Sequence, residues 1–350
     1  MRPSLLTQLV DPVHRRSLRL VDPTPGSGDV ATGVLEASDG ARYPVQNGIP
    51  RFVGSEDEAQ RQTSAAFAYK WRKRETYDSP AARGLALEWY LEKYGFATLD
   101  QWVTTYGGHR RILDLGCGSG FSSSLWLGAA GWQGQSTWIG VDISDAIDVA
   151  QERLGHIPET HFVQADALRL PFADAAFDLV FSEGVLHHTP STRQALLSAA
   201  RVLEPGGSFH FYVYRRKAPV REFTDDYVRH LLQPMSDDEA WAAMRPLTRL
   251  GQLLAHLHAT VEIPEDIPLL GIQAGRYDVQ RLIYWNFAKL FWNPQLTFEE
   301  NVHINFDWYR PRYAHRQTAA EVQSWCAEAG LEVDRFHEGD AGFTVRARRR

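Results

Sequence analysis

This chain has few cysteines, and its sequence shows neither a long apolar run nor an excess of positive charge. The only cysteines are Cys117 and Cys326, which excludes a disulfide framework and a thiolate zinc site. No long apolar stretch follows Arg2 at the amino terminus, so neither a signal peptide nor a membrane span is indicated, and we expect a cytoplasmic protein. The formal net charge of −6 argues against a surface for nucleic acid or anionic membrane.

What remains is the composition of an ordinary globular protein. Hydrophobic residues make up 44% of the chain and charged residues 23%. A chain of 350 residues can bury a sizeable core and is long enough for more than one domain. The composition therefore leaves the function to be inferred from motifs.

An apolar run that breaks into alternating glycines is the central feature of the sequence. Residues 111–120 read Arg-Ile-Leu-Asp-Leu-Gly-Cys-Gly-Ser-Gly. The run predicts a buried parallel strand, and the glycines predict a turn that brings the main chain close to a ligand. The helix expected from about Phe121 would present its amide end to the same place. We therefore expect a ligand site at this turn.

The spacing of the glycines and the acids downstream bear on the nature of the ligand. Dinucleotide-binding turns follow the pattern G-x-G-x-x-G, whereas the glycines of residues 116–120 alternate. Asp142 ends the next apolar run, where a carboxylate can accept the hydroxyl groups of a ribose. Asp166 follows a third apolar run, residues 177–188 hold a fourth, and a Pro-Gly-Gly turn at 205–207 leads into a fifth.

In this order the motifs resemble those of class I S-adenosylmethionine-dependent methyltransferases over roughly residues 107–217. The resemblance implies an α/β, Rossmann-like fold, with a mostly parallel sheet, helices on both faces and a ligand crevice outside the carboxyl ends of the strands. It implies S-adenosyl-L-methionine as the cofactor, with Asp142 on the ribose and with Asp166 and the Ala167 N–H on the adenine. The cofactor-binding residues that it implies in this core are Asp114, Gly116, Cys117, Gly118, Gly120, Asp142, Ile143, Asp166, Ala167 and Ser182.

Each of these motifs has a simpler explanation when it is taken alone. A lone alternating-glycine stretch is often just a tight turn, and a lone acid at a strand end is often a helix cap. Asp178 is interpreted in that way, as a packing residue. It is the joint order of the glycines, the two acids and the later turn that favours a cofactor site.

Residues 56–106 turn polar and then helical, with an amphipathic stretch from Leu85 to Tyr94. In the family, a helix ahead of the core often covers the cofactor with aromatic side chains. Tyr69 and Trp71 are therefore candidates for cofactor contact. The alternative is that both rings only pack this helix onto the sheet.

Residues 1–55 are expected to form a separate small unit, with short strands around a turn at Asn47-Gly48. The ending Tyr-Pro-(x)3-Gly-Ile-Pro-Arg-Phe at 43–52 resembles the zinc-ribbon-like activator domain of tRNA and protein methyltransferases. The positions of its zinc-binding cysteines are occupied here by Asp11, His14, Glu36 and Asp39. Because structural zinc sites use Cys or His, we expect a degenerate ribbon without metal, and a carboxylate–imidazole site is the alternative.

Two histidines and one acid after the fourth strand are candidates for catalysis. His187 or His188 could accept a proton from a hydroxyl or amine nucleophile as the methyl group moves. The alternative is that the imidazole only fixes the loop or lines the cofactor pocket. Glu183 is a competing candidate, because a carboxylate at a strand end could orient or deprotonate an acceptor.

Residues 218–312 are a long insertion ahead of the closing elements in 313–350. Helices are predicted over 221–232, 237–257 and 279–292, and the last third is crowded with aromatic residues and arginines. These residues are expected either to form a core or to cover the acceptor as a lid, which would suit an aromatic or anionic acceptor. The predicted acceptor-binding residues are Tyr214, Arg310, Tyr313 and His315.

The leading interpretation is methyl transfer by in-line displacement to an O, N or C atom of a small molecule, such as a natural-product or glycan intermediate. The base-methylating signature Asn/Asp-Pro-Pro-Tyr is absent after the fourth strand, where Ser182–Val185 stands, which argues against nucleic acid. The alternatives are a cofactor-binding partner or regulatory protein without turnover, an RNA or protein methyltransferase, and aminopropyl transfer. The sequence is also compatible with a homodimer.

Overall fold

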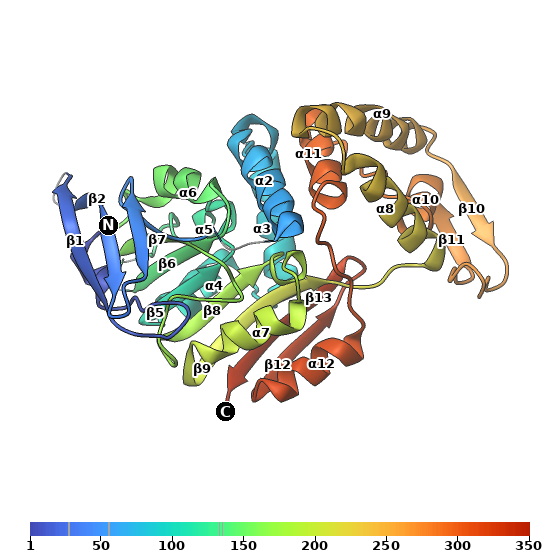
Figure 1. Ribbon diagram of the computed structural model, residues 1–350. Coiled ribbons are helices and arrows are strands. Elements are labelled where there is room, and N and C mark those ends of the chain that lie inside the picture. Colours follow the sequence, from blue (N-terminus) through green and yellow to red (C-terminus); the bar gives the residue numbers. More distant parts are fainter. Residues whose placement is uncertain (27–28, 55–56, 133, 135) are drawn as a thin grey trace.

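One twisted sheet runs through the molecule and carries the expected parallel centre (Figure 1). The computed structural model describes residues 1–26, 29–54, 57–132, 134 and 136–350. Within these residues the sheet has the order β1-β2-β3-β4-β7-β6-β5-β8-β9-β13-β12. Pairing is parallel from β4 to β9 and antiparallel at both ends. The α/β class with a Rossmann-like parallel centre is therefore confirmed.

The elements follow one another as strands and helices that alternate through the core. The strands are β1 (Leu18–Pro25), β2 (Val30–Ala37), β3 (Arg42–Gln46), β4 (Ile49–Phe52), β5 (Arg111–Leu115), β6 (Thr137–Asp142), β7 (Thr160–Ala165), β8 (Phe177–Glu183), β9 (Leu203–Tyr214), β10 (Thr260–Ile263), β11 (Gly275–Asp278), β12 (Leu331–Glu338) and β13 (Gly342–Arg349). The helices are α1 (Pro3–Leu6), α2 (Glu58–Arg72), α3 (Pro80–Tyr94), α4 (Leu99–Gly107), α5 (Phe121–Ser124), α6 (Ala146–Leu154), α7 (Thr192–Arg201), α8 (Pro219–Leu232), α9 (Asp237–His256), α10 (Val279–Asn286), α11 (Phe298–Tyr309) and α12 (Ala319–Glu328), with 3₁₀ turns η1 (Arg74–Thr76) and η2 (Leu186–His188).

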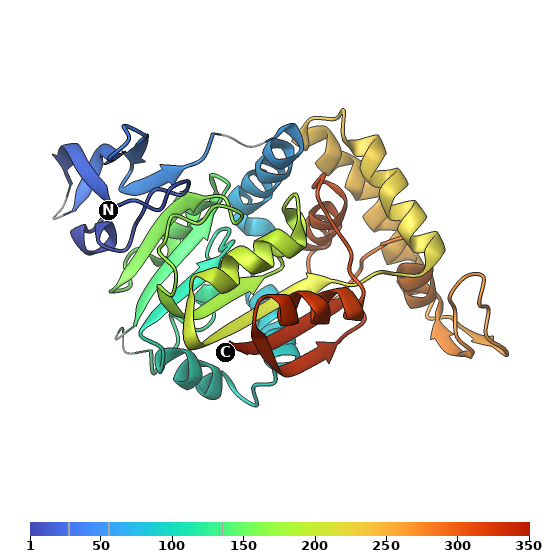
Figure 2. The same ribbon diagram turned by 60° about the horizontal axis from the view of Figure 1, so that its bottom comes forward.

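Two apolar cores form because side chains alternate across the central strands. In β5, Leu113 and Leu115 face one core and Ile112 faces the other. Helices α7 and α12 lie side by side over the first core (Figure 2), and α3, α4 and α6 cover the second. With both faces covered, the carboxyl ends of the parallel strands are the natural place for a ligand.

The amino-terminal strands differ from the separate ribbon-like unit expected from the sequence. The Asn47-Gly48 turn does form a hairpin, with both residues at positive φ (53° and 76°). Strand β4 then pairs in parallel with β7, and the Arg51 guanidinium donates 2.7 Å hydrogen bonds to the Gln164 side chain and to Asp148. Backbone pairing and these contacts join residues 1–52 to the core sheet, so the zinc-ribbon-like interpretation is not supported.

The four residues considered as metal ligands make hydrogen bonds or ion pairs with other side chains and with the backbone. Asp11 accepts hydrogen bonds from the Tyr43 hydroxyl and the His14 N–H, and Glu36 pairs with arginine side chains. The His14 Nε2 lies 3.7 Å from Asp39 Oδ2. Among the described residues no group of three or more His, Cys, Asp or Glu side chains is arranged to hold a metal ion.

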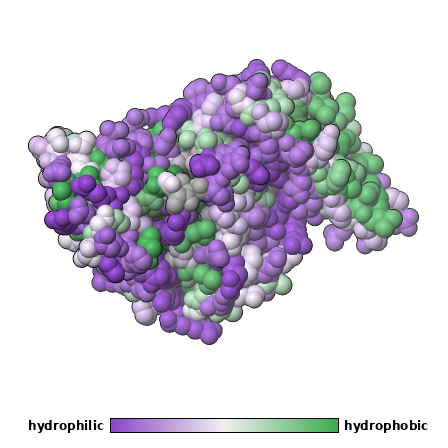
Figure 3. Space-filling model, viewed as in Figure 1, coloured by the Kyte–Doolittle hydropathy of each residue, from purple (hydrophilic) through white to green (hydrophobic). Residues whose placement is uncertain are grey.

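The insertion contains four helices and a small hairpin, and it reaches the core through α11, which packs against α2 and η1 (Figure 1). Helices α8 and α9 agree with the predicted ranges, whereas α10 ends at Asn286 and α11 was not predicted. The outer end of the insertion is hydrophobic (Figure 3), where α9 exposes Leu250, Leu253 and Leu257. Within the described residues, no helix combines the length and apolar character needed to cross a membrane.

Candidate cofactor and acceptor site

A cavity of about 620 Å³ opens between the strand ends, α2 and the insertion. At the sheet it is lined by the residues that follow β5 to β8, namely Leu115, Gly116, Val141, Asp142, Ile143, Ala165, Asp166, Ala167, Glu183, Gly184 and Val185. At the insertion it is lined by cationic and aromatic side chains, including Lys217, Arg221, Tyr284, Trp285, Lys289 and Trp308. The cavity therefore has a glycine turn and acidic side chains at the sheet, and cationic and aromatic side chains at the insertion.

The glycine turn has the backbone shape that its sequence predicts. Gly116, Gly118 and Gly120 all lie at positive φ, at 77°, 54° and 71°. A Cβ added to Gly116 would overlap the Val185 side chain, so only glycine fits there. The Gly116 N–H donates to the Val141 carbonyl across a 2.6 Å hydrogen bond, which ties the turn to β6.

Asp142 stands at the end of β6 with its carboxylate held in place. Its Oδ2 accepts from the Gly118 N–H at 2.8 Å, and its Oδ1 accepts from the Ser144 N–H and hydroxyl at 2.8 and 2.6 Å. Burial raises the pKa of this carboxyl, and the hydrogen bonds from Ser144 and Gly118 oppose that shift. Each carboxylate oxygen can accept about two hydrogen bonds, so Oδ2, which accepts one, remains able to accept from a ligand hydroxyl, whereas Oδ1 already accepts two.

Asp166 lies across the same end of the cavity, directly after β7. Its Oδ1 accepts from the Leu168 N–H at 2.9 Å, and its Oδ2 lies 3.4 Å from the Arg169 guanidinium. Ala167 lines the cavity beside it. The two carboxylates, Asp142 and Asp166, are fixed acceptors beside the glycine turn. This arrangement fits a nucleoside, which carries hydroxyl and amino groups that can donate to them.

Other predicted cofactor residues support this end of the cavity from behind. Asp114 is buried, accepts a 2.6 Å hydrogen bond from the Ser123 hydroxyl, and has a pKa raised to about 7 by burial. The Ser182 hydroxyl donates to the Leu115 carbonyl at 3.0 Å. Burial raises the pKa of the Cys117 thiol well above its usual value. The structure places Asp114, Cys117, Gly118, Gly120 and Ser182 in or under the turn rather than on the cavity lining.

The two aromatic residues predicted from α2 have different positions. Trp71 lines the cavity and covers the turn, since a Cβ on Gly118 would come within 2.8 Å of the Trp71 Nε1. Tyr69 lies outside the cavity, where its hydroxyl donates a 2.5 Å hydrogen bond to Asp238 and its ring packs against Trp241 and Phe306. Tyr69 thus joins α2 to the insertion.

His188 lines the cavity in a defined tautomer. Its Nδ1 lies 2.6 Å from the Tyr313 carbonyl oxygen, and because a carbonyl only accepts, Nδ1 must carry the proton. Burial lowers the pKa of His188 to about 4, although Asp307 acts in the opposite direction. At neutral pH the ring is therefore uncharged, and Nε2 is left as an acceptor.

His187 is buried behind His188 and does not line the cavity. Its ring centre lies 3.7 Å from that of Tyr214, and neither ring nitrogen has a hydrogen-bond partner among the described residues. Burial lowers its pKa well below the usual value. These contacts are those of a packing residue.

Glu183 lines the cavity, but both of its carboxylate oxygens are already engaged. One accepts from the Lys93 ammonium and the other from the Tyr94 hydroxyl at 2.6 Å. The side chains of Lys93 and Glu183 are only 2% and 8% exposed, and burial lowers the pKa of Lys93 to about 8. This carboxylate is therefore an ion-pair partner first, and a proton acceptor only if the pair is broken.

The segment that runs from strand β5 into strand β9 is similar to a known protein family. Residues 113–211 match the family described as "Methyltransferase domain". This segment is a methyltransferase domain. S-adenosyl-L-methionine is the cofactor of this domain.

The methyltransferase domain is similar to parts of curated proteins. The ubiquinone/menaquinone biosynthesis C-methyltransferase UbiE of Vibrio parahaemolyticus is 32% identical over 133 residues, 37% of this chain and 51% of that protein. The phthiotriol/phenolphthiotriol dimycocerosates methyltransferase of Mycobacterium leprae is 32% identical over 131 residues, 37% of this chain and 47% of that protein. The chain thus spans about half the length of these relatives.

A solved structure is also similar to this chain. The magnesium protoporphyrin IX methyltransferase of Synechocystis PCC 6803, with bound SAM, is 12% identical, with a TM-score of 0.43. The match covers 85% of this chain and 100% of that one.

The structure brings the predicted acceptor residues only partly together. Tyr214 lines the cavity. Arg310 instead donates to Asp237 and to the Leu232 and Met235 carbonyl oxygens, which joins the end of α8 to the start of α9. Tyr313 and His315 also lie outside the cavity, and the Tyr313 hydroxyl donates to Asp57 at 2.9 Å.

A buried ion pair in the cavity was missed by sequence reasoning. The Lys70 ammonium from α2 contacts the Asp307 carboxylate from α11. Burial acts to raise the pKa of Asp307, but Lys70, His188 and Lys289 together hold that pKa well below the usual range. The signal that the sequence offered for this pair was the scarcity of lysine. A rare residue type such as Lys70 in a helix suggests a specific ion-pair partner.

The tautomer of His188 can be tested directly. At pH 6 we expect a neutral ring with the proton on Nδ1, because the pKa lies about two units below that pH. Nitrogen-15 NMR of labelled protein would report both nitrogens, and the His188→Gln variant would assign the signals. A doubly protonated His188 ring at pH 6 would contradict this assignment.

Proposed function

We propose that the protein is an enzyme that transfers a methyl group from S-adenosylmethionine to a small molecule held between the glycine turn and the insertion. The observation that carries the proposal is the single cavity with Asp142 and Asp166 at one end and the aromatic insertion at the other. A cavity of about 620 Å³ supports a small acceptor, because ligand pockets for small molecules have volumes in this range.

The residues of the chain have separable tasks in this proposal. Asp142, Asp166 and the glycine turn would hold the cofactor, which supplies a methyl group activated on sulfur. Trp71 and the insertion would exclude water and align the acceptor for in-line displacement. An oxygen or nitrogen nucleophile that loses a proton would donate it to the His188 Nε2. The Lys93 pair keeps Glu183 from competing for that proton.

The proposal is tested with the full chain and labelled S-adenosylmethionine. We expect S-adenosylhomocysteine to bind, and S-adenosylmethionine to be consumed with members of a panel of small aromatic and anionic acceptors. The readouts are calorimetry for binding and label transfer for turnover. Failure of the wild-type chain to bind either nucleoside would overturn the proposal, and binding without transfer to any acceptor would favour a partner protein without turnover.

The role of His188 predicts a split between turnover and binding. We expect His188→Ala to lower kcat by about 10²- to 10⁴-fold, the usual contribution of a general base, while the Kd of S-adenosylhomocysteine stays within about twofold. The control is His109→Ala, because His109 lies near Asp178, away from the cavity. An unchanged kcat in His188→Ala would leave the imidazole with a positioning role only.

A further inference from the structure

Lysine is scarce in this chain and is concentrated at the cavity. The residue occurs only as Lys70, Lys73, Lys93, Lys217 and Lys289. Three of these line the cavity, and Lys93 pairs with Glu183, which lines it too. An ammonium is compact and strongly hydrated, so burying it is unfavourable unless an anion or several acceptors compensate. Each buried lysine ammonium is therefore expected to have an anionic partner or several hydrogen-bond acceptors.

Of the four lysines at the cavity, the buried Lys70 and Lys93 have carboxylate partners, whereas the half-buried Lys217 and the buried Lys289 have none among the described residues. Lys70 pairs with Asp307 and Lys93 with Glu183. The Lys217 ammonium donates only to the backbone carbonyl oxygens of residues 340 and 341, at 2.6 and 2.8 Å. Lys289 is 6% exposed, and in the described part of the chain its ammonium has no hydrogen-bond acceptor or ion-pair partner.

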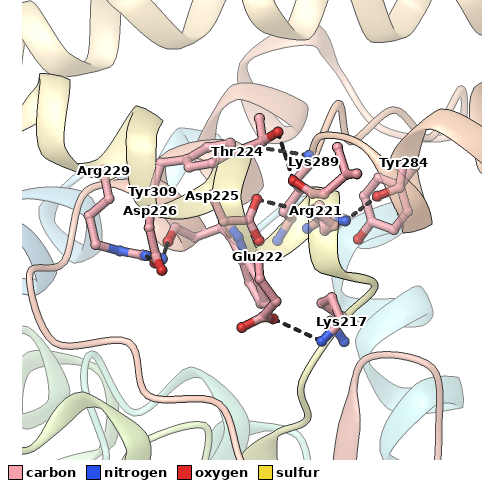
Figure 4. A network of polar contacts seen from close by, with 12 residues as sticks. Lys217, Arg221, Glu222, Thr224, Asp225, Asp226, Arg229, Tyr284, Lys289 and Tyr309 are labelled. Carbon is pink, nitrogen blue, oxygen red and sulfur yellow. Dashed lines mark hydrogen bonds and ion pairs between the residues drawn. The ribbon is translucent and has the colours of Figure 1, made fainter. Parts of the chain in front are cut away.

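Lys217, Arg221 and Lys289 surround one indole ring. Their cationic groups lie 5.9, 5.3 and 4.5 Å from the centre of the Trp308 ring. Figure 4 shows these three residues close together, with Tyr284 beside them. Arg221 is 1% exposed and pairs with Asp225 at 2.8 Å. When protonated, Lys217 and Lys289 have no carboxylate partner in the described part of the chain, since Asp225 pairs with Arg221 and Asp307 pairs with Lys70.

The pKa values of both lysines are lowered, because neither lysine has a carboxylate partner among the described residues. Burial, together with the nearby Arg221, Arg215 and Lys289, lowers the pKa of Lys217 to about 6. Burial lowers the pKa of Lys289 to about 7, where Asp307 opposes the shift and Arg221 adds to it. A bound anion would favour the charged form of both groups.

We propose that Lys217, Arg221 and Lys289 form a subsite for an oxyanion, a carboxylate or phosphate, on a ligand whose ring lies against Trp308. Each cation can donate hydrogen bonds to oxygen, and the indole offers a flat apolar surface next to them. The part of this proposal that makes the ligand the methyl acceptor rests on the proposed function. In that case the oxyanion would fix the acceptor at the end of the cavity remote from Asp142.

The test uses probes that share a naphthalene ring and differ in the charge of the attached group; the carboxylate and the amide are also closely matched in shape. Binding of 2-naphthoate, 2-naphthyl phosphate and neutral 2-naphthamide is measured by ligand-observed NMR on the full chain without cofactor. We expect at least one anion to bind with a Kd at least tenfold below that of the amide. The preferred anion shows whether carboxylate or phosphate is the natural group. Equal affinity for anion and amide, or no saturable binding of either anion, would overturn the proposal.

Variants assign the preference to the subsite. Lys289→Gln is expected to lose the tenfold preference, Lys289→Arg to keep most of it, and Lys73→Gln, a matched lysine off the cavity lining, to keep all of it. A preference that survives in Lys289→Gln and in Lys217→Gln would contradict the assignment. Calorimetry with S-adenosylhomocysteine checks that each variant is folded. If the wild-type chain binds the anions but not this nucleoside, the proposed function fails and the subsite remains.

Discussion

The Lys93→Met variant is expected to lose about 3–5 kcal/mol of unfolding free energy, the usual cost of removing one partner from a buried ion pair. The reason is that Glu183 would keep its charge at 8% exposure with only the Tyr94 hydroxyl as a donor. The Lys93 ammonium also lies 3.3 Å from the Trp89 ring, so cation–π stabilisation is lost with it. Urea unfolding followed by circular dichroism measures the change.

A double variant separates the lost charge from lost packing. Lys93→Met combined with Glu183→Gln removes both charges, and we expect it to recover most of the stability, because a neutral pair of similar size is tolerated in a buried site. The surface variant Arg110→Met, which breaks an exposed pair with Glu204, is expected to change stability by less than about 1 kcal/mol. If Lys93→Met is no less stable than Arg110→Met, the buried pair does not stabilise the fold.

The second large effect is expected at Asp142. Asp142→Ala should weaken S-adenosylhomocysteine binding by roughly 30-fold or more, which corresponds to about 2 kcal/mol at 1.4 kcal/mol per tenfold. The substitution removes the acceptor for ribose hydroxyls and also frees the Gly118 and Ser144 N–H groups that the carboxylate holds. Isothermal calorimetry gives the affinity directly.

The matched control for this variant is the neighbouring acid Asp145. Its side chain is 60% exposed, pairs with Arg72 and does not line the cavity. Asp145→Ala should therefore keep its affinity for S-adenosylhomocysteine within about twofold. Equal affinity in wild type and Asp142→Ala would show that the nucleoside lies elsewhere, and the proposed function would lose its main support.

The core and the cofactor end could be predicted because their signals are local. The alternating glycines specify a backbone shape that other residues cannot adopt, and each acid comes directly after its own apolar run. Parallel strands bring their carboxyl ends to one edge, so sequence order alone places Asp142 and Asp166 near the turn.

The insertion was predicted less well because its structure depends on long-range partners. Helix α10 ends early, and the following segment is held by side chains of α11: Asn305 accepts from the Phe291 N–H and Asn301 from the Asn293 N–H. These bonds replace helical ones and have no local signature. Helix α11 itself had a signal, the capping box from Thr297 to Glu300.

Three of the four predicted acceptor residues, Arg310, Tyr313 and His315, lie outside the cavity for a similar reason. Arg310 was predicted as an acceptor contact because arginine often binds anions, yet it satisfies carbonyl oxygens at the end of α8. The lysines that do line the cavity are far apart in the sequence, and only the packing of α2, α8 and α11 brings Lys70, Lys217 and Lys289 to one place. Charge type alone could not distinguish these roles.

The pairing of β4 with β7 has a consequence for solubility. Strand β7 carries Asp166 at its end and would be an open edge if the first four strands were removed. An unprotected parallel strand offers free N–H and C=O groups to a second molecule and invites self-association. A truncated chain that begins at α2 should therefore aggregate, with its nucleoside-binding end most affected.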